Sequence, residues 1–282
     1  MPTTSDFPKQ FAGQYAVVTG STQGMGEAVA RLLAQRGAAG IVICGRKAKQ
    51  GEAIARDLSG LGCDARYVQA DLGKVADCRA VIAAADKAWG KLHVLANCAA
   101  ITDRGTILDT SPELFDTMFA VNVRAPFFLM QDAMKIMLRE RIAGSIVNLI
   151  TMSSYGGQPF ITAYCASKGA LATLTRNVAF AAARDRIRVN GLNIGWSSTP
   201  GEDRIMKTYH GAQDGWLADA ERQQPFGRLI KPDEVARAVA YLASAESGLM
   251  TGSVIDFDQS VRGAYDSPPL PAESLLRNPT AA

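Results

Sequence analysis

YAVVTGSTQGMGEAVARLLAQR, residues 15–36, places a short apolar run, a turn with three glycines and a helical pattern in direct succession. The apolar run from Tyr15 to Thr19 predicts a buried strand, and the spacing of apolar residues after Gly26 predicts a helix. Glycines between the two allow the backbone to approach a pyrophosphate, and the helix start supplies free N–H groups and a positive dipole end. Three glycines can also serve a tight bend alone, but their position between strand and helix favours a phosphate-binding turn.

The same alternation continues along the chain. Further apolar runs lie at 41–44, 65–70, 93–97, 145–150, 187–194 and 254–257, and helical patterns separate them up to residue 243. Strands that alternate with helices predict a mostly parallel sheet with helices on both faces. Only the stretch 195–226 breaks the rhythm, and its length predicts a binding loop. We therefore expect an N-terminal extension (1–13), a single α/β domain (14–262) that includes the substrate loop 195–226, and a Pro-rich tail (263–282).

Composition narrows the class of protein. Of 282 residues, 48% are hydrophobic, and 30 Lys and Arg against 27 Asp and Glu are scattered along the chain, which argues against nucleic acid or an anionic membrane as partner. No apolar run reaches ~18 residues, and the N-terminus lacks the pattern of a signal peptide. Five cysteines without a disulfide or metal spacing favour a reducing compartment, and the two histidines, His93 and His210, offer no metal site. These features predict a soluble, cytoplasmic protein without a metal.

A second informative stretch is TMSSYGGQPFITAYCASK, residues 151–168. Tyr164 and Lys168 are four residues apart, so on a helix they share one face and the ammonium can favour ionisation of the phenol. The usual pKa of a tyrosine, near ~10, is too high for proton transfer at neutral pH without such help. Thr151 and Ser153 add hydroxyls that can hold a substrate oxygen. An isolated Tyr and Lys at this spacing are also typical of a solvated helix face.

The end of the second predicted strand bears on the choice of cofactor. An NAD site wants a carboxylate there, whereas this chain has Gly45-Arg46-Lys47. Arg46 suits a 2′-phosphate, which predicts NADP with NAD as the alternative, although an arginine at a strand end can simply face water. Asp71 closes the third strand, where it can bond an adenine edge or cap a turn. Asn97 ends the fourth strand, where it can tie strands together or line the crevice.

The glycine turn, the Tyr164 and Lys168 pair and their separation together resemble the short-chain dehydrogenase/reductase family, from about Gln14 to Asp258. Asp71, Asn97 and Asn122 also fall in the order that the family uses. The resemblance implies a Rossmann-type, doubly wound sheet of seven parallel strands and a homotetramer. It further implies that Tyr164 exchanges a proton with the substrate, that Lys168 lowers the tyrosine pKa and holds the nicotinamide ribose, and that Asn122 supports a water in a proton relay.

Several positions depart from the family pattern. Asn97-Cys98-Ala99-Ala100 lacks a glycine, Ile194-Gly195 replaces Pro-Gly, and Asp256-Phe257-Asp258 replaces a glycine pair. Thr151 stands where the family has its catalytic serine, and it keeps the hydroxyl with a stiffer side chain. Ser153 is the rival for this role, since Ser153 to Gly156 matches a local pattern, although a turn hydroxyl that bonds its own backbone is as ordinary.

We therefore expect an NAD(P)-dependent oxidoreductase that acts on a secondary alcohol or its ketone. The polar residues of the substrate loop favour a sugar or polyol. A dinucleotide sensor without activity is the alternative, and a lyase or epimerase is a third possibility. The expected catalytic residues are Asn122, Thr151, Tyr164 and Lys168. The expected cofactor residues are Gly20, Ser21, Gln23, Gly24, Met25, Gly26, Arg46, Asp71, Leu72, Asn97, Tyr164, Lys168, Gly195 and Thr199, and the expected substrate residues are Ser153 and Trp196.

Overall fold

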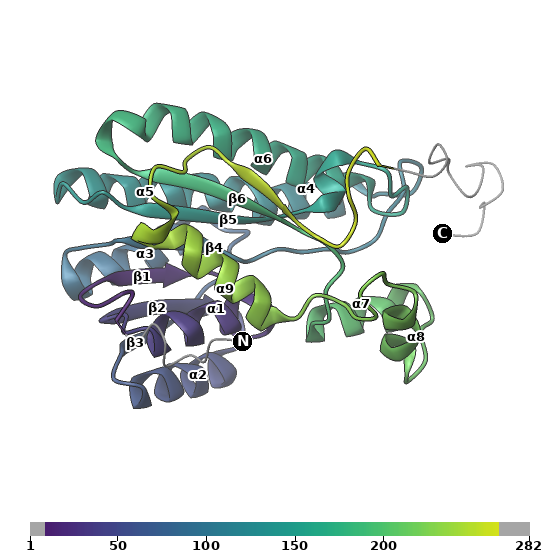
Figure 1. Cartoon of the computed structure of the whole chain (residues 1–282), viewed down its shortest axis with the longest axis horizontal. Helices are drawn as coiled ribbons and strands as arrows, with labels where there is room; N and C mark the ends of the chain where they lie inside the picture. Colours follow the sequence, from purple (N-terminus) through teal and green to yellow (C-terminus); the bar gives the residue numbers. More distant parts are fainter. Residues whose placement is uncertain (1–8, 265–282) are drawn as a thin grey trace.

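The computed structural model describes residues 9–264. Residues 1–8 and 265–282, with most of the predicted tail, lie outside this range. Within it, seven parallel strands form one sheet in the order β3-β2-β1-β4-β5-β6-β7, as Figure 1 shows. The strands are β1 Tyr15–Val18, β2 Gly40–Gly45, β3 Asp64–Gln69, β4 Val94–Asn97, β5 Ser145–Thr151, β6 Arg188–Ile194 and β7 Val254–Phe257. The predicted doubly wound sheet of seven parallel strands is confirmed.

Helices connect the strands at close to the predicted positions. They are α1 Gly24–Gln35, α2 Ala48–Gly60, α3 Val75–Trp89, α4 Pro112–Phe119, α5 Ala125–Arg139, α6 Thr162–Ala182, α7 Pro200–Tyr209, α8 Trp216–Arg222 and α9 Pro232–Ala243. A π-helical segment, Ala120–Arg124, joins α4 to α5, and short 3₁₀ turns lie at Met152–Tyr155, Ala183–Asp185 and Ala245–Ser247. No helix in residues 9–264 is long and apolar enough to cross a membrane.

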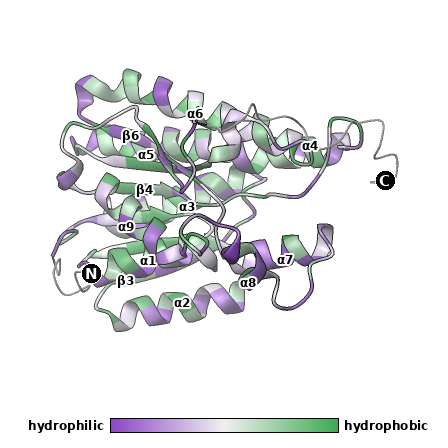
Figure 2. Cartoon of the chain, turned by 45° about the vertical axis from the view of Figure 1, so that its right-hand side comes forward, coloured by the Kyte–Doolittle hydropathy of each residue, from purple (hydrophilic) through white to green (hydrophobic). Residues whose placement is uncertain are grey.

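Each central strand divides its side chains between two cores. Ala16 and Val18 of β1 pack with α1, α2 and α9 on one face, whereas Val17 packs with α3, α5 and α6 on the other. Because both faces are covered, β1 and β2 are nearly continuous apolar runs, and β2 is buried from Gly40 to Cys44. Figure 2 shows the mainly hydrophobic colour of β4 among helices of mixed colour.

The predicted N-terminal extension joins this core before its expected end. Phe11 is only 1% exposed, and its N–H donates to Arg36 O at 2.9 Å. Ala12 pairs with Ala38 in an isolated bridge. The chain is therefore part of the packed domain from Phe11 onward.

The substrate loop 195–226 contains two helices, α7 and α8, which lie at the right-hand end of the molecule in Figure 1. Helix α7 begins with an N-cap. Pro200 is its first residue, and the hydroxyl of the N-cap residue Thr199 accepts a hydrogen bond from the Glu202 N–H at 3.1 Å. The indole rings of Trp196 and Trp216 stack with centroids 6.1 Å apart, which holds the start of the loop against α8.

Candidate active site

A cleft of about 2640 Å³ runs along the carboxyl ends of the strands. In a doubly wound sheet, the chain turns to opposite sides of β1 and opens a crevice at this edge. The predicted residues that line the cleft are Gly20, Gln23, Gly24, Met25, Gly26, Arg46, Asp71, Leu72, Thr151, Ser153, Tyr164, Lys168, Gly195, Trp196 and Thr199. Ser21, Asn97 and Asn122 are not part of the lining.

Neighbouring atoms exclude a side chain at two positions of the glycine turn. Gly20 has φ +61°, and a Cβ there would lie 2.7 Å from Ala99 Cα. A Cβ at Gly26 would lie 2.4 Å from the carbonyl oxygen of Gly20. No side chain caps the start of α1, so its first N–H groups remain available at the cleft wall. This cradle of backbone and helix end fits the phosphates of a dinucleotide.

Two predicted cofactor residues turn their side chains inward. The Ser21 hydroxyl donates to Val18 O at 2.6 Å and accepts from the Cys44 N–H at 3.0 Å, which ties the glycine turn to β1 and β2. The Asn97 amide donates to Asn148 Oδ1 at 2.8 Å and joins β4 to β5. Of the two roles considered for Asn97, the structure shows the tie between strands and not the lining of the crevice, because its side chain is buried within the sheet.

The end of β2 leaves little room for any side chain at Gly45. A Cβ there would lie 2.6 Å from Thr22 Cγ2 and 2.7 Å from its Oγ1. Arg46 is exposed and lines the cleft directly beyond this point. Asp71 also lines the cleft, and its Oδ1 accepts the Gly73 N–H at 3.1 Å, so it caps the following turn.

The missing glycine after β4 causes no backbone strain. The N–H groups of Cys98 and Ala99 donate to Thr19 Oγ1 at 3.0 and 3.2 Å. Among the described residues, Arg141 and Arg186 are the non-glycine residues with positive φ, so Ala99 and Ala100 adopt ordinary conformations. Cys98 lines the cleft, and burial raises the pKa of its thiol to about 12.

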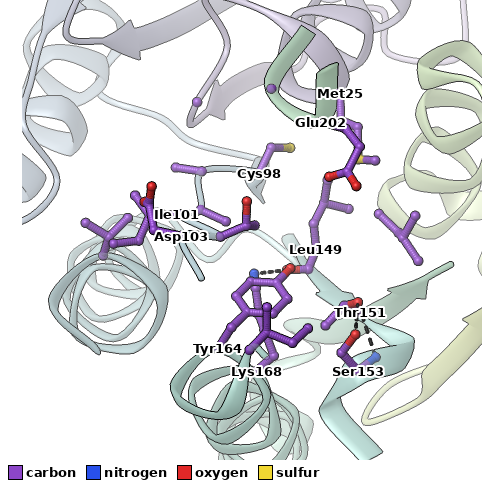
Figure 3. A pocket seen from close by; sticks show the side chains of 18 of the residues that line it. Met25, Cys98, Ile101, Asp103, Leu149, Thr151, Ser153, Tyr164, Lys168 and Glu202 are labelled. Carbon is purple, nitrogen blue, oxygen red and sulfur yellow. Dashed lines mark hydrogen bonds between the residues drawn. The ribbon is translucent and has the colours of Figure 1, made fainter. Parts of the chain in front are cut away.

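Tyr164 and Lys168 project from α6 into the cleft, as Figure 3 shows. The Lys168 Nζ donates to Leu149 O at 2.8 Å and lies 5.9 Å from the centre of the Tyr164 ring. Burial lowers the Lys168 pKa to about 8. Burial also raises the Tyr164 pKa above its usual value, and this effect outweighs the opposite effects of a hydrogen bond with Thr151 and of the Arg104 charge. In this structure desolvation of the phenolate dominates the Tyr164 pKa, and the lowering of that pKa by Lys168 stays a prediction.

Thr151 and Ser153 differ in their partners. The Thr151 side chain acts on the Tyr164 phenol and lowers its pKa, and the Thr151 oxygen accepts the Ser153 N–H at 3.3 Å. The Ser153 hydroxyl donates to Gln158 Oε1 at 2.6 Å. Thr151 closes β5 and caps the 3₁₀ turn that follows, which holds its hydroxyl beside the phenol. The geometry thus favours Thr151 over Ser153 as the partner of Tyr164.

Asn122 lies in the π-helical segment and is fully buried. Its Oδ1 accepts the Ile101 N–H at 3.0 Å, and its Nδ2 donates to Ile101 O at 3.0 Å and to Ser167 Oγ at 3.1 Å. The amide therefore fastens the loop after β4 to α6 beneath the cleft. The predicted proton relay through Asn122 stays a prediction.

Two charged residues that the sequence did not single out, Asp103 and Arg104, lie at the other end of the cleft, beside Glu202 and His210 of the substrate loop. Arg104, in the loop after β4, donates from Nε to His210 Nε2 at 3.1 Å, and its Nη2 lies 3.8 Å from Glu202 Oε1. Asp103 accepts the Tyr209 hydroxyl at 2.9 Å. These contacts connect the loop to α7 and to the residue after it. For Asp103 and Arg104 the sequence offers no motif. Only their position after a strand indicates a role, since the loops after the strands of such sheets form the binding site.

The C-terminal acidic pair also takes defined positions. A Cβ at Gly195 would lie 1.8 Å from Asp258 Oδ1, so the carboxylate lies directly against that glycine. Asp256 Oδ1 accepts the Tyr155 hydroxyl at 2.8 Å and the Asn193 amide at 2.9 Å. The acids that replace the glycine pair therefore join the segment after β7 to the cleft wall.

Comparison with known proteins agrees with this arrangement. A family model described as enoyl-(acyl carrier protein) reductase matches residues 20–260. The chain belongs to the short-chain dehydrogenase/reductase family. It is 34% identical over 249 residues to 4-formylbenzenesulfonate dehydrogenase of Comamonas testosteroni, a match that covers 87% of this chain and 96% of the relative.

Two further members of the family broaden the comparison. Galactitol 2-dehydrogenase of Agrobacterium fabrum is 28% identical over 249 residues, with 86% of this chain and 95% of the relative covered. A crystal structure of an actinorhodin polyketide ketoreductase variant with NADPH superposes with a TM-score of 0.81 at 26% identity, with 88% of this chain and 96% of that chain covered. Since the relatives are named dehydrogenases and reductases, the chain is an oxidoreductase of this family that uses a nicotinamide dinucleotide.

Proposed function

We propose that the protein transfers a hydride between NADP(H) and a secondary alcohol or its ketone, with Tyr164 as the proton-transfer group. One observation carries the proposal: the glycine turn and the Thr151, Tyr164 and Lys168 side chains line one continuous cleft. The bound nicotinamide would supply the hydride chemistry, and the protein would position the reactants and manage the proton.

Thr151, Tyr164 and Lys168 each have a distinct role in the proposed reaction. The Tyr164 hydroxyl exchanges a proton with the substrate oxygen, and Thr151, which acts on the phenol, donates to the same oxygen. Lys168 is anchored by Leu149 O and presents its remaining N–H donors to the ribose of the cofactor. Because the ammonium is buried and the phenol is half-buried, closer approach of the charge to the phenol favours phenolate more strongly than it would in water.

The preference for NADP(H) rests on the end of β2. Thr22 occupies the space beside Gly45, so the carboxylate typical of NAD sites is absent and has no room. Arg46, exposed at the cleft rim, offers a planar set of donors that suits a 2′-phosphate. The structural relative solved with NADPH is consistent with this choice.

A polar substrate, of sugar or polyol type, fits the far end of the cleft. Charged and hydrogen-bonding groups from α7 and the loop after β4 lie there with the ring of Trp196, which can stack on a sugar face. The relative named galactitol 2-dehydrogenase supports a polyol. The predicted homotetramer and cytoplasmic location stay predictions.

A panel of polyols, sugars, secondary alcohols and ketones, assayed with NADP(H) and NAD(H), tests the proposal. We expect turnover of polar substrates with the higher specificity constant for NADP(H). Higher specificity constants for bulky apolar ketones would refute the substrate class. Absence of turnover with every compound, combined with tight cofactor binding, would instead indicate a dinucleotide sensor.

A further inference from the structure

Arg104 is a nearly buried cation in the substrate end of the cleft. Its side chain is 14% exposed and lines the cleft. Nη1 donates to Thr102 O at 2.8 Å and Nε donates to His210 Nε2 at 3.1 Å. Both of these acceptors are uncharged, since a histidine nitrogen that accepts a hydrogen bond carries no proton.

The Arg104 guanidinium has a carboxylate nearby, but that carboxylate forms no hydrogen bond with it. The nearest carboxylate oxygen, Glu202 Oε1, lies 3.8 Å from Nη2, beyond hydrogen-bond distance. That oxygen already accepts the Trp196 indole N–H at 2.9 Å. Burying a guanidinium without a hydrogen-bonded anion is costly, and an arginine fork is best satisfied by two oxygens of one planar or tetrahedral anion. Among the described residues, Nη2 of Arg104 therefore has no hydrogen-bond acceptor, and it can donate to an anion in the cleft.

Arg104 and Tyr164 line the same cleft. The Glu202 charge raises the phenol pKa, and the Arg104 charge opposes this with a smaller effect. The Phe160 ring lies beside the guanidinium at 5.5 Å and supplies an apolar wall. One small molecule can thus reach Tyr164 with its oxygen and Arg104 with a second group.

We propose that Arg104 binds an anionic group of the substrate, a carboxylate or a sulfonate, while the reacting oxygen lies at Tyr164 and Thr151. This inference rests on the proposed oxidoreductase function and narrows its substrate class to hydroxy acids and oxo acids, including sugar acids. Glu202 acts as a weak internal competitor for the guanidinium, so it favours release of the anion after turnover.

Matched pairs that differ only in charge test the inference. Gluconate against gluconamide, and 4-acetylbenzoate against 4-acetylbenzamide, are titrated into the enzyme with NADP⁺, and binding is followed by quenching of tryptophan fluorescence. Charge-assisted hydrogen bonds predict at least about tenfold tighter binding of the acid in at least one pair. Equal affinities of acid and amide in both pairs would overturn the inference, whether or not any compound is turned over.

Three variants separate substrate binding from a structural role of Arg104. Arg104→Gln removes the preference for the acid, and Arg104→Lys, which keeps the charge without the fork, retains part of it. Glu202→Gln removes the competitor, so it strengthens acid binding several-fold. If Arg104 only anchors α7 through Glu202, then Glu202→Gln weakens ligand binding as Arg104→Gln does, and the inference fails.

Tyr209→Phe is the matched control for the contact between loop and helix. Tyr209 is the last residue of α7, does not line the cleft and donates to Asp103 at 2.9 Å, so the change weakens the same contact without altering a charge or touching Arg104. The acid-to-amide ratio should stay as in the wild type. Turnover of alcohols without any preference for acids would defeat this inference alone, whereas the absence of all turnover would defeat the proposed function and leave the binding ratio to decide.

Discussion

The two ends of the cleft are built by different means. At the cofactor end, one continuous stretch of chain, residues 19–26, forms the wall with its backbone, and neighbouring backbone leaves no space for a Cβ at Gly20 or Gly26. At the substrate end, side chains from three distant segments, 102–104, 151–158 and 196–210, line the cleft, and hydrogen bonds and ion pairs such as that of Arg104 and Glu202 join the first segment to the third. A change at the first end must therefore move the main chain, whereas a change at the second alters individual contacts.

This difference indicates which positions of the cleft tolerate amino-acid substitutions and which do not. Backbone sterics at the glycine turn tolerate few substitutions, because the displaced atoms belong to the sheet and its first helix. Side-chain contacts around α7 can be exchanged one at a time, with effects on substrate choice and small effects on the fold. Five changes of decreasing expected effect test this division.

Tyr164→Phe should have the largest effect and should be confined to the chemical step. Removal of the proton-transferring hydroxyl is expected to lower kcat by ~10²–10⁴. The dissociation constant of NADP(H), measured by fluorescence titration, should stay nearly unchanged because the cofactor end is intact. A variant that keeps a tenth of the wild-type rate would contradict the role of Tyr164.

Thr151→Ala and Ser153→Ala compare two hydroxyls at the same end. Loss of a donor to the reacting oxygen costs roughly 10²-fold in kcat, and we expect this for Thr151, which acts on the Tyr164 phenol. Ser153→Ala should have a smaller effect, since its hydroxyl bonds Gln158. Steady-state kinetics of both variants decide the matter, and the reverse order would move the role to Ser153.

Lys168→Met tests the buried ammonium through the pH dependence of stability. The Lys168 pKa falls from 10.5 to about 8 in the folded protein, so the unfolded chain binds more protons between these values. The free energy of unfolding of the wild type should therefore rise with pH from about 8 to 10.5, relative to the variant, by on the order of 3 kcal/mol. Urea unfolding at a series of pH values measures this, and a difference that does not vary with pH would contradict the burial of the charge.

Gly26→Ala tests the backbone wall. The added methyl group would meet the Gly20 carbonyl oxygen at 2.4 Å, and we expect a loss of about 1–3 kcal/mol in stability together with weaker cofactor binding. Gly60→Ala, where nothing lies within 4 Å of the new atom, is the control and should be neutral or slightly stabilising. Equal behaviour of the two variants in thermal unfolding would remove the distinction between the two ends.

Arg46→Ala should have the smallest effect, because Arg46 is an exposed side chain at the rim of the cofactor end. Loss of a charge-assisted contact with the 2′-phosphate should raise KM for NADP(H) by about tenfold and leave KM for NAD(H) almost unchanged. Arg56→Ala, on the exposed side of α2, is the control. Equal losses with both cofactors would show that Arg46 does not contact the 2′-phosphate.

The fold could be predicted almost completely from the sequence. Alternating apolar runs and helical patterns place the strands within one or two residues, since burial on both faces demands continuous apolar strands. The irregular composition of 195–226 hid α7 and α8, because short helices held by caps and tertiary contacts lack a long apolar period. Phe11 was missed for a related reason, since a lone aromatic residue before the first strand has no pattern of its own.

The site was predictable where neighbours in sequence form it and less so elsewhere. The glycine turn and the Tyr164 and Lys168 pair are local motifs, so their positions followed from spacing. Arg104 and Glu202 are far apart in sequence, and only folding brings them together. The desolvation that raises the Tyr164 pKa could not be predicted from the sequence, because it depends on all surrounding atoms, which no local motif records.

The close approach of Thr22 to Gly45 has a consequence for how cofactor preference can evolve. An aspartate at 45 is the simplest route to an NAD enzyme, yet its Cβ would overlap a buried, β-branched side chain that has little freedom to rotate. The single change Gly45→Asp is therefore expected to be deleterious on its own and acceptable only after Thr22 has become smaller. The order of the two substitutions is thus constrained, and a laboratory lineage selected for NAD use should acquire the change at 22 before the acid at 45.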